Sequence, residues 1–405
     1  MLLTLAWRNI WRNKRRTIIT SSSIAFALLF ALFMRGFQIG SYGNMIDNLV
    51  QAYTGYIQVH AKGYWNDQTL DNSFVQNNIM MQKIAKIPHV TALIPRLESF
   101  ALVSEGQKTK GIAVCGIEPM TETALTKLSQ KIVGGRYLNS TDRGVLIAEG
   151  LSNYLKLRVN DTLVMIGQGY HGVSAAGKFV VTGILHFPSP ELNNQMVYLT
   201  LSNARNFFST DNRLTSIALN LDDKHKIQST VKQIKKVIIS ENYEVLSWET
   251  MLLDLVQYIK LDQGSSFIML GILYFVIAFG ILGTLMMMIS ERTREFGMMV
   301  AVGMKRMKIA IVVMIEMLYI AIIGALSGII LSLPVLFYFS HHPIRITGEA
   351  AKMAESFEME PVMPVAFQSG YFIEQSLIIL FILAVVLIYP LSGIFHLNLI
   401  KALRR

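Results

Sequence analysis

Cysteine and charged residues are scarce in this 405-residue chain. The single cysteine, Cys115, excludes an intramolecular disulfide and any zinc or iron–sulfur site built from several cysteines. Charged residues make up 16% and apolar residues 52% of the sequence, whereas soluble globular chains carry about 25% charged residues. The mean hydropathy is +0.42. This composition excludes a disordered or fibrous chain and argues against a wholly soluble protein.

Four apolar stretches are long enough to cross a bilayer, which needs about 20 residues. They are 18–37, 267–289, 309–333 and 372–395, and we expect Pro334 to end the third. The alternative is four buried helices of a large soluble protein, but such helices usually carry a polar stripe that these barely show. No small-x-small cleavage site follows the first stretch, so we interpret it as an uncleaved anchor.

Basic residues collect at one set of span ends. The N-terminus 1–17, the loop 290–308 and the tail 396–405 hold five, five and three basic residues, opposed only by Glu291 and Glu295. Positive charge is retained on the cytoplasmic side of a membrane. Both termini and this loop are therefore predicted to be cytoplasmic.

The other segments between the spans lack this excess of positive charge. Segment 35–265 carries 22 basic and 19 acidic residues, and segment 340–371 carries two basic and four acidic ones. We therefore expect 38–265 and 334–371 to lie outside the cytoplasm, in a multi-pass membrane protein. Because the net charge of +10 flanks the spans and does not form one face, nucleic-acid binding is disfavoured.

Segment 38–265 mixes strand and helix patterns and predicts a large extracytoplasmic α+β domain. Its last part, 248–261, has apolar residues at helical spacing and predicts a stalk that leads into the second span. The predicted strands are Tyr56–His60, Ser99–Ser104, Thr109–Gly116, Gly144–Ile147, Asp161–Ile166, Phe179–Leu185, Met196–Leu199 and Leu214–Leu221, with helices at Ala148–Leu155 and Lys224–Ser240.

Two glycine-rich runs resemble phosphate-binding loops. Gly167–Gly172 matches GxGxxG, and Gly172–Lys178 matches most of a P-loop. Such a loop must open a helix, whose N-terminal amides meet the phosphate. Here Phe179 takes the place of the magnesium-binding Ser or Thr, and the next residues read as a strand. A glycine-rich hairpin is the better interpretation.

Signals for catalysis and metal binding are equally thin. The eight histidines are scattered, and the adjacent pair His341 and His342 is poorly placed to chelate one ion. The sequence has no GxSxG and no HExxH motif. We expect no metal site, no bound cofactor and no enzyme activity in this chain alone.

The loop 290–308 is the most informative segment. Glu291 and Glu295 suit the start of a helix, and Lys305, Arg306 and Lys308 suit its end. A solvated connector between two spans would explain the same residues.

Together, these segments resemble the FtsX-like permeases of type VII ABC transporters. The loop is similar to the coupling helix of that family at Glu291, Arg292, Arg294, Glu295, Gly297, Ala301 and Gly303. Ala6–Thr17 resembles the opening of the family, and Leu399–Leu403 its ending. Gly134–Leu151 is similar to the MacB-like periplasmic domain, and the layout is closest to the lipoprotein-releasing (Lol-type) permeases.

The resemblance implies a complex of two permeases, identical or paralogous, with two copies of a separate ABC ATPase that binds ATP and Mg²⁺. It implies that the loop helix sits in a groove of that ATPase. Phe296 would be the apolar anchor, and Glu291, Arg292, Arg294 and Glu295 would pair at the rim. We therefore expect Phe296→Ala to lower stimulated ATPase activity more than Arg292→Ala.

Within the spans, few polar groups could line a pore, so the resemblance favours mechanical transmission over an aqueous channel. Glu316 is the exception and is a functional candidate, although it lies only about 10 Å into its span and could reach interfacial water. Ile24, Leu28 and Leu32 share a helical face that could line a lateral path for lipid or face bulk lipid.

Three functions remain open. The first is release of lipoproteins from the inner membrane, with a periplasmic carrier as a further partner. The second is MacB-like export of peptides or small amphiphiles through a partner tunnel. The third is FtsX-like regulation of a cell-wall hydrolase, which usually goes with a smaller outer domain than 38–265.

Overall fold

The computed structural model describes the chain except for residues 1, 13, 107, 239–240, 352–361 and 397–405. Nearly all of the predicted tail 396–405 and part of the segment 334–371 therefore lie outside the described residues. Contacts divide the chain into two units. The helical unit comprises Met1–Gly43, Tyr258–Arg345 and Val362–Arg405, and the α+β unit comprises Asn44–Gln257 and Ile346–Pro361.

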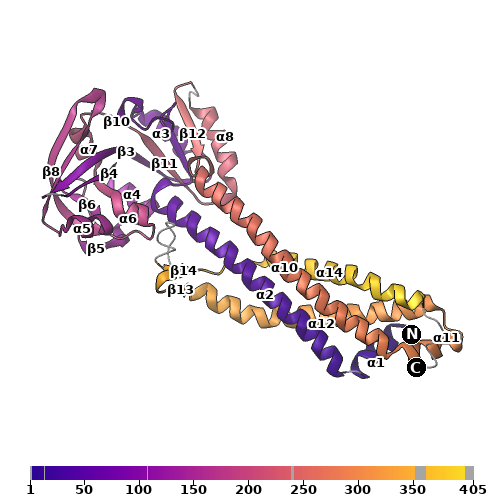
Figure 1. Ribbon diagram of the computed structural model, residues 1–405. Helices are drawn as coiled ribbons and strands as arrows, with labels where there is room; N and C mark the ends of the chain where they lie inside the picture. Colours follow the sequence, from indigo (N-terminus) through magenta and orange to yellow (C-terminus); the bar gives the residue numbers. More distant parts are fainter. Residues whose placement is uncertain (1, 13, 107, 239–240, 352–361, 397–405) are drawn as a thin grey trace. The chain divides into compact units, whose positions relative to one another are not determined.

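Among the described residues, four helices are long and apolar enough to cross a membrane (Figure 1). They are α2 (Lys14–Leu49), α10 (Leu253–Glu291), α12 (Arg306–His341) and α14 (Ser369–Phe395). Each covers one of the four predicted spans, and three of them extend well beyond it. Two shorter helices, α1 (Leu2–Arg12) and α11 (Thr293–Ala301), complete the helical unit, with a small β13–β14 pair (Ile344–Arg345 and Val362–Met363).

Hydroxyl side chains near the start of α2 bond within their own helix. The hydroxyls of Thr20 and Ser23 donate to the carbonyl oxygens of Arg16 and Ile19, one turn earlier in α2. Backbone and hydroxyl groups that bond within their own helix leave no unpaired polar group for an apolar surrounding. The Ser and Thr residues are therefore compatible with a membrane span.

Two expected helix ends are wrong. Helix α12 continues through Pro334 to His341, because a proline removes only one backbone hydrogen bond and can be accommodated in an apolar helix. The stalk does not begin as one helix at Trp248. A short helix α9 (Trp248–Met251) ends at Leu252, whose backbone leaves the helical region (φ −105°, ψ 52°), and α10 then runs unbroken from Leu253.

Small residues bring α2 and α12 together. A Cβ atom at Gly328 would lie 2.8 Å from the carbonyl oxygen of Ala25, and one at Gly324 would lie 2.8 Å from the Cβ atom of Ile24. Glycines four residues apart let helix backbones approach closely, which is how helices associate where lipid removes the hydrophobic driving force. The same pattern serves that purpose here.

The α+β unit is built on a ten-stranded mixed sheet (Figure 1). Its longest strand, β3, is 16 residues long and pairs with β11, β4 and β7. The pairs β4–β9 and β6–β8 are parallel, and the others are antiparallel. In sheet order the strands are β12 (Tyr243–Ser247), β1 (Ile57–Ala61), β11 (Ser216–Leu221), β3 (Val90–Glu105), β4 (Lys108–Ile117), β9 (Met196–Thr200), β6 (Val145–Ala148), β8 (Ser174–Leu185) and β5 (Ile132–Gly135), with β7 (Thr162–Gln168) joined to β3 and β8.

Short helices accompany the sheet, and a separate β2–β10 pair (Phe74–Val75 and Arg213–Leu214) lies off it. A buried ion pair ties one helix to the central strand: the Arg96 guanidinium donates to both carboxylate oxygens of Glu122, at 2.9 and 2.6 Å. Both residues are fully buried. The helices are α3 (Asn78–Ala85), α4 (Pro119–Thr126), α5 (Glu149–Leu155), α6 (Pro190–Gln195), α7 (Leu201–Phe208) and α8 (Ile227–Val237).

The glycine-rich segment is a hairpin, as the sequence indicated. Strands β7 and β8 pair antiparallel, from Thr162 opposite Val180 to Gln168 opposite Ser174. The turn holds Gly172 at φ +76°, a backbone conformation that favours glycine. Because a strand and not a helix follows, the segment lacks the helix N-terminus that a phosphate-binding loop requires.

The fold class of four long apolar helices and an α+β domain is confirmed.

Candidate functional site

The charged loop lies at the end of the helical unit where α1 and α11 are found (Figure 1). Arg292 stands between the last residue of α10 and the first residue of α11. Its backbone (φ −94°, ψ 4°) lies outside the ideal helical region, so the chain changes direction there. The nine-residue α11 ends at Ala301 and Gly303 follows at φ +97°, the left-handed conformation in which glycine ends a helix.

Charged residues from three helices form a continuous chain of alternating sign, which we call the charge chain. It begins in the bundle, where Arg292 Nη1 donates to Glu316 Oε2 at 2.6 Å. Arg292 Nε donates to Glu295 Oε2 at 3.2 Å, and Arg12 Nη2 donates to both Glu295 oxygens at 2.9 and 2.8 Å. The charge chain therefore links α12, α11 and α1.

Exposure rises along the charge chain. The side chains of Glu316 and Arg292 are 4% and 5% exposed, whereas those of Glu295 and Arg12 are 41% and 55% exposed. The Arg292 guanidinium also lies over the ring of Phe296, 5.2 Å from its centroid. Glu316 is thus a buried partner of Arg292. Of the two interpretations left open by the sequence, access to interfacial water does not fit this burial.

A second ion pair joins α10 to α2, since Arg16 donates to a carboxylate oxygen of Glu291. The sequence resemblance had placed Glu291, Arg292 and Glu295 at the rim of a contact with another protein. In the structure, all three bind residues of their own chain. Sequence reasoning missed Arg12 and Arg16, because their partners are about 280 residues away and no local pattern connects them.

Phe296 does not face outward. Its side chain is 1% exposed and packs in the core of the helical unit, and Gly297 beside it is also buried. The expected role of Phe296 as an anchor for a partner is therefore wrong for this structure. The helical period contained the signal, since Phe296 lies one turn from Arg292 and on the opposite side from Arg294.

The outward face of α11 consists of other residues. Arg294, Met298, Ala301 and Val302 recur at helical spacing and are exposed. Met298 is 49% exposed, and Val302, which directly follows α11, is 90% exposed. Gly303 is exposed as well. Sequence reasoning had included Arg294, Ala301 and Gly303 but neither of the two apolar side chains.

Two cavities adjoin this face. One, of about 320 Å³, lies among α1, α11 and α12 and is lined by Leu5, Asn9, Phe296 and Met299 together with residues of the charge chain. The other, of about 590 Å³, is lined by Leu2, Met298, Met299, Val302, Gly303, Met304 and Lys308. The second is an apolar recess with flexible methionine walls, which adapt readily to an inserted side chain.

Ile24, Leu28 and Leu32 lie elsewhere than expected. All three are fully buried in the core of the helical unit, and Ile24 and Leu28 approach Gly324 and Gly328 of α12. They serve helix packing. The expectation that this face lines a lipid path or contacts bulk lipid is therefore not met in this structure.

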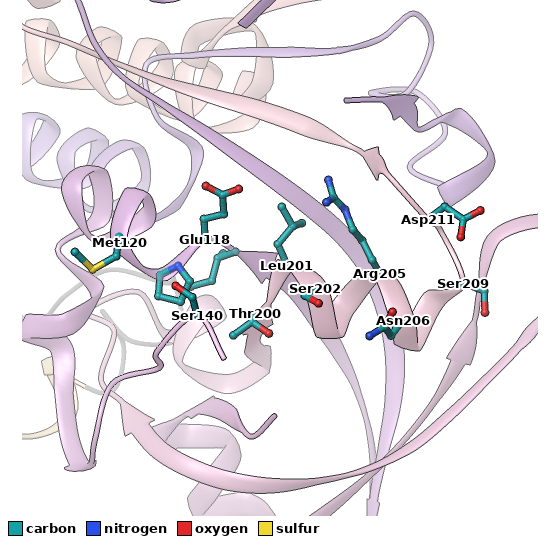
Figure 2. Close-up of a pocket in the computed structure, with 12 residues that line it drawn as sticks. Glu118, Met120, Ser140, Thr200, Leu201, Ser202, Arg205, Asn206, Ser209 and Asp211 are labelled. Carbon is teal, nitrogen blue, oxygen red and sulfur yellow. The ribbon is translucent and has the colours of Figure 1, made fainter. Parts of the chain in front are cut away.

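A further cavity of about 830 Å³ lies in the α+β unit, between the starts of α4 and α7. Figure 2 shows Glu118 and Arg205 among its lining residues, together with Ser202, Asn206 and Asp211. The Arg205 guanidinium is already engaged, since it donates to Gln76 Oε1 at 2.6 Å and to the Arg213 carbonyl oxygen at 3.3 Å. Burial lowers the pKa of Arg205, and the carboxylate of Glu118 opposes that shift. The cavity has mixed charge and indicates no particular ligand.

Among the described residues, no three His, Cys, Asp or Glu side chains are grouped so that they could hold a metal ion. Cys115 is buried and is a free thiol that forms no disulfide.

Known proteins resemble most of the chain at low identity. The lipoprotein-releasing system transmembrane protein LolC of Neisseria meningitidis is 21% identical over 335 residues, which are 79% of this chain and 77% of that protein. LolC of Xylella fastidiosa is 22% identical over 250 residues, 60% of each chain. The macrolide export ATP-binding/permease protein MacB of Campylobacter jejuni is 21% identical over 360 residues, 83% of this chain and 53% of MacB.

Among solved structures, the periplasmic region of MacB from Actinobacillus actinomycetemcomitans aligns with 52% of this chain and 95% of its own length, at 14% identity and a TM-score of 0.37. The family described as FtsX-like permease C-terminal matches residues 267–399. This range contains α11, α12, α14 and most of α10. Over this range, the chain is similar to the FtsX-like permeases.

Proposed function

We propose that this chain is the permease subunit of an ABC transporter in the bacterial inner membrane, and that it releases lipoproteins from that membrane. The outward face of α11 supports this proposal most directly. Met298 and Val302 expose apolar surface between two spans, beside an apolar recess of about 590 Å³. Exposed apolar residues next to a recess are typical of a surface that binds another protein.

In this proposal, α11 faces the cytoplasm and binds one copy of a separate ABC ATPase, in which ATP and Mg²⁺ are held. The complex contains two permeases and two ATPase subunits. An ATPase partner is in keeping with the MacB relative, whose name includes both ATP-binding and permease parts. ATP-driven closure of the ATPases would move α11, the long helices and the periplasmic α+β domain.

The choice of lipoprotein as substrate depends on the LolC relatives, one of which matches 79% of this chain. A periplasmic carrier would receive the released lipoprotein. Export of a peptide or small amphiphile is the second candidate, because MacB matches a similar share of the chain, 83%. The two proposals differ in the molecule that leaves the membrane.

The test is purification of the tagged chain in mild detergent, mass spectrometry of the bound molecules, and reconstitution with the bound ATPase in proteoliposomes that contain an acylated lipoprotein. We expect an ABC ATPase to co-purify, and ATP to release the lipoprotein into a soluble carrier. An ATPase complex that moves a peptide or amphiphile and leaves the lipoprotein in place would establish the export function. Absence of any ATPase would contradict both.

A further inference from the structure

The charge chain contains a buried ion pair, Arg292–Glu316, that neither packing nor solubility requires. Glu316 and Arg292 are almost fully buried, and removing two charges from water costs more than apolar side chains of the same size would. Ionisable residues in apolar helices are rare and usually functional.

Its position is at a junction. Arg292 is the residue between α10 and α11, and both ends of its guanidinium are used: Nη1 on Glu316 of α12 and Nε on Glu295 of α11. A planar guanidinium with two fixed partners is held in orientation as well as in place. The angle between α10 and α11 is therefore set by a contact with α12.

The charge chain then continues to α1. Glu295 accepts from Arg292 with one oxygen and from Arg12 with both. The charge chain and the pair Arg16–Glu291 together hold three acidic and three basic residues. Each of these three acidic side chains has a basic partner. The exposed charges around it are basic ones such as Arg294, Lys305 and Lys308.

We propose that the charge chain Glu316–Arg292–Glu295–Arg12 is a positioning device: it fixes α11 to α12 and α1, so that a displacement of α11 is transmitted to them and is not absorbed at the α10–α11 junction. This inference rests on the proposed function only for the source of the displacement. The acidic residues of the charge chain, Glu316 and Glu295, bind residues within the permease. The ATPase binds a surface of apolar and basic side chains.

The primary test measures distances and needs no partner. In the full-length protein with Cys115→Ser, spin labels are placed at Ala301→Cys on α11 and either Leu318→Cys on α12 or Leu3→Cys on α1, which are exposed positions. We expect narrow distance distributions for both pairs. Glu316→Gln should at least double the width for the α11–α12 pair, whereas Arg12→Gln should broaden only the α11–α1 pair. Arg294→Gln, an exposed change in the same helix, should broaden neither.

A double variant separates charge from packing. Glu316→Gln alone leaves the Arg292 charge buried without its partner and could destabilise the bundle. Arg292→Met with Glu316→Leu removes both charges and keeps apolar volume, so thermal stability should return. We expect the α11–α12 distribution to stay broad in this variant. A narrow α11–α12 distribution in it, or in Glu316→Gln, would overturn the proposal.

A coupling measurement on unlabelled protein completes the test. With the ATPase bound, Arg292→Gln should lower substrate-stimulated ATPase activity at least fivefold while the ATPase concentration at half-saturation changes less than twofold. Arg292→Lys, which keeps the charge, should recover part of the activity. A loss that follows weaker ATPase binding would overturn the positioning role. If the wild-type permease binds no ATPase, the proposed function fails, and the distance measurements still decide whether the charge chain holds α11.

Discussion

At the scale of single residues, the structure favours Val302 over Phe296 as the apolar side chain that binds the ATPase. The sequence resemblance had favoured Phe296. Val302 is 90% exposed and Phe296 is 1% exposed. An apolar side chain that a partner buries typically costs 2 kcal/mol or more when it is lost at the centre of an interface. Val302→Asp should therefore weaken ATPase binding by about 30-fold or more, which corresponds to about 2 kcal/mol. The affinity is measured by titrating labelled ATPase onto purified permease.

The matched control is Phe296→Leu, a change inside the bundle. It keeps most of the apolar volume, so it should cost the permease less than about 1.5 kcal/mol of stability and leave the affinity for the ATPase within twofold. Equal losses of affinity in both variants would show that α11 turns over when the partner binds. Unchanged affinity in Val302→Asp would exclude this face as the binding surface.

Single residues also show what could not be predicted from the sequence. Glu291, Arg292 and Glu295 were identified as site residues, but the sequence did not show that their side chains bind residues of their own chain. Helical spacing separates Phe296 from Arg294 and could have shown that the two cannot face the same partner. The pairs Arg12–Glu295 and Arg16–Glu291 could not have been found, because they depend on how α1 and α2 pack against α11 and α10. Distant ion pairs follow from tertiary packing, which one sequence does not encode locally.

At the scale of elements, the crossing of α2 and α12 depends on two glycines. A Cβ atom at Gly328 would lie 2.8 Å from the Ala25 carbonyl oxygen, and backbone atoms cannot move aside as a flexible side chain can. Gly328→Ala should therefore separate the helices and destabilise the helical unit by about 1–3 kcal/mol, as overpacking does. The measurement is the midpoint of SDS-induced unfolding in mild detergent, followed by tryptophan fluorescence. Trp7 reports on the helical unit, since it packs against Tyr319 of α12.

The control is the same change in α10. A Cβ atom at Gly271 would meet nothing within 4 Å, and alanine favours a helix over glycine by about 1 kcal/mol. Gly271→Ala should therefore leave the midpoint unchanged or raise it. The packing argument would be contradicted if Gly271→Ala lowered the midpoint, or if Gly328→Ala left it unchanged.

Elements were more predictable than their ends. Hydropathy found all four long helices, and alternation found β1, β4, β6, β7 and β9 close to their observed bounds. The strand β3 was underestimated, since residues from Val90 also belong to it. Pro334 was misread as a helix end, because the rule that proline ends a helix is weaker in apolar helices. Strand order could not be predicted, since the sheet joins strands that are distant in the chain, such as β4 and β9.

At the scale of the whole molecule, the α+β unit and the loop 290–308 are expected on opposite sides of the membrane. Positive charge clusters in 1–17 and 290–308, and cytoplasmic loops carry such an excess. Met120 in the α+β unit and Val302 beside α11 are 79% and 90% exposed, so a cysteine at either position would be open to reagents. The native thiol, Cys115, is fully buried and should contribute little background.

Met120→Cys and Val302→Cys therefore test the orientation directly. On intact spheroplasts, a membrane-impermeant maleimide should label the cysteine at position 120 and spare the one at position 302, and after lysis it should label both. The orientation is measured as the ratio of labelling before and after lysis. Labelling of position 302 in intact spheroplasts would place α11 outside the cytoplasm. An ATPase could then not reach Met298 and Val302, and the apolar face that supports the proposed function would need another partner.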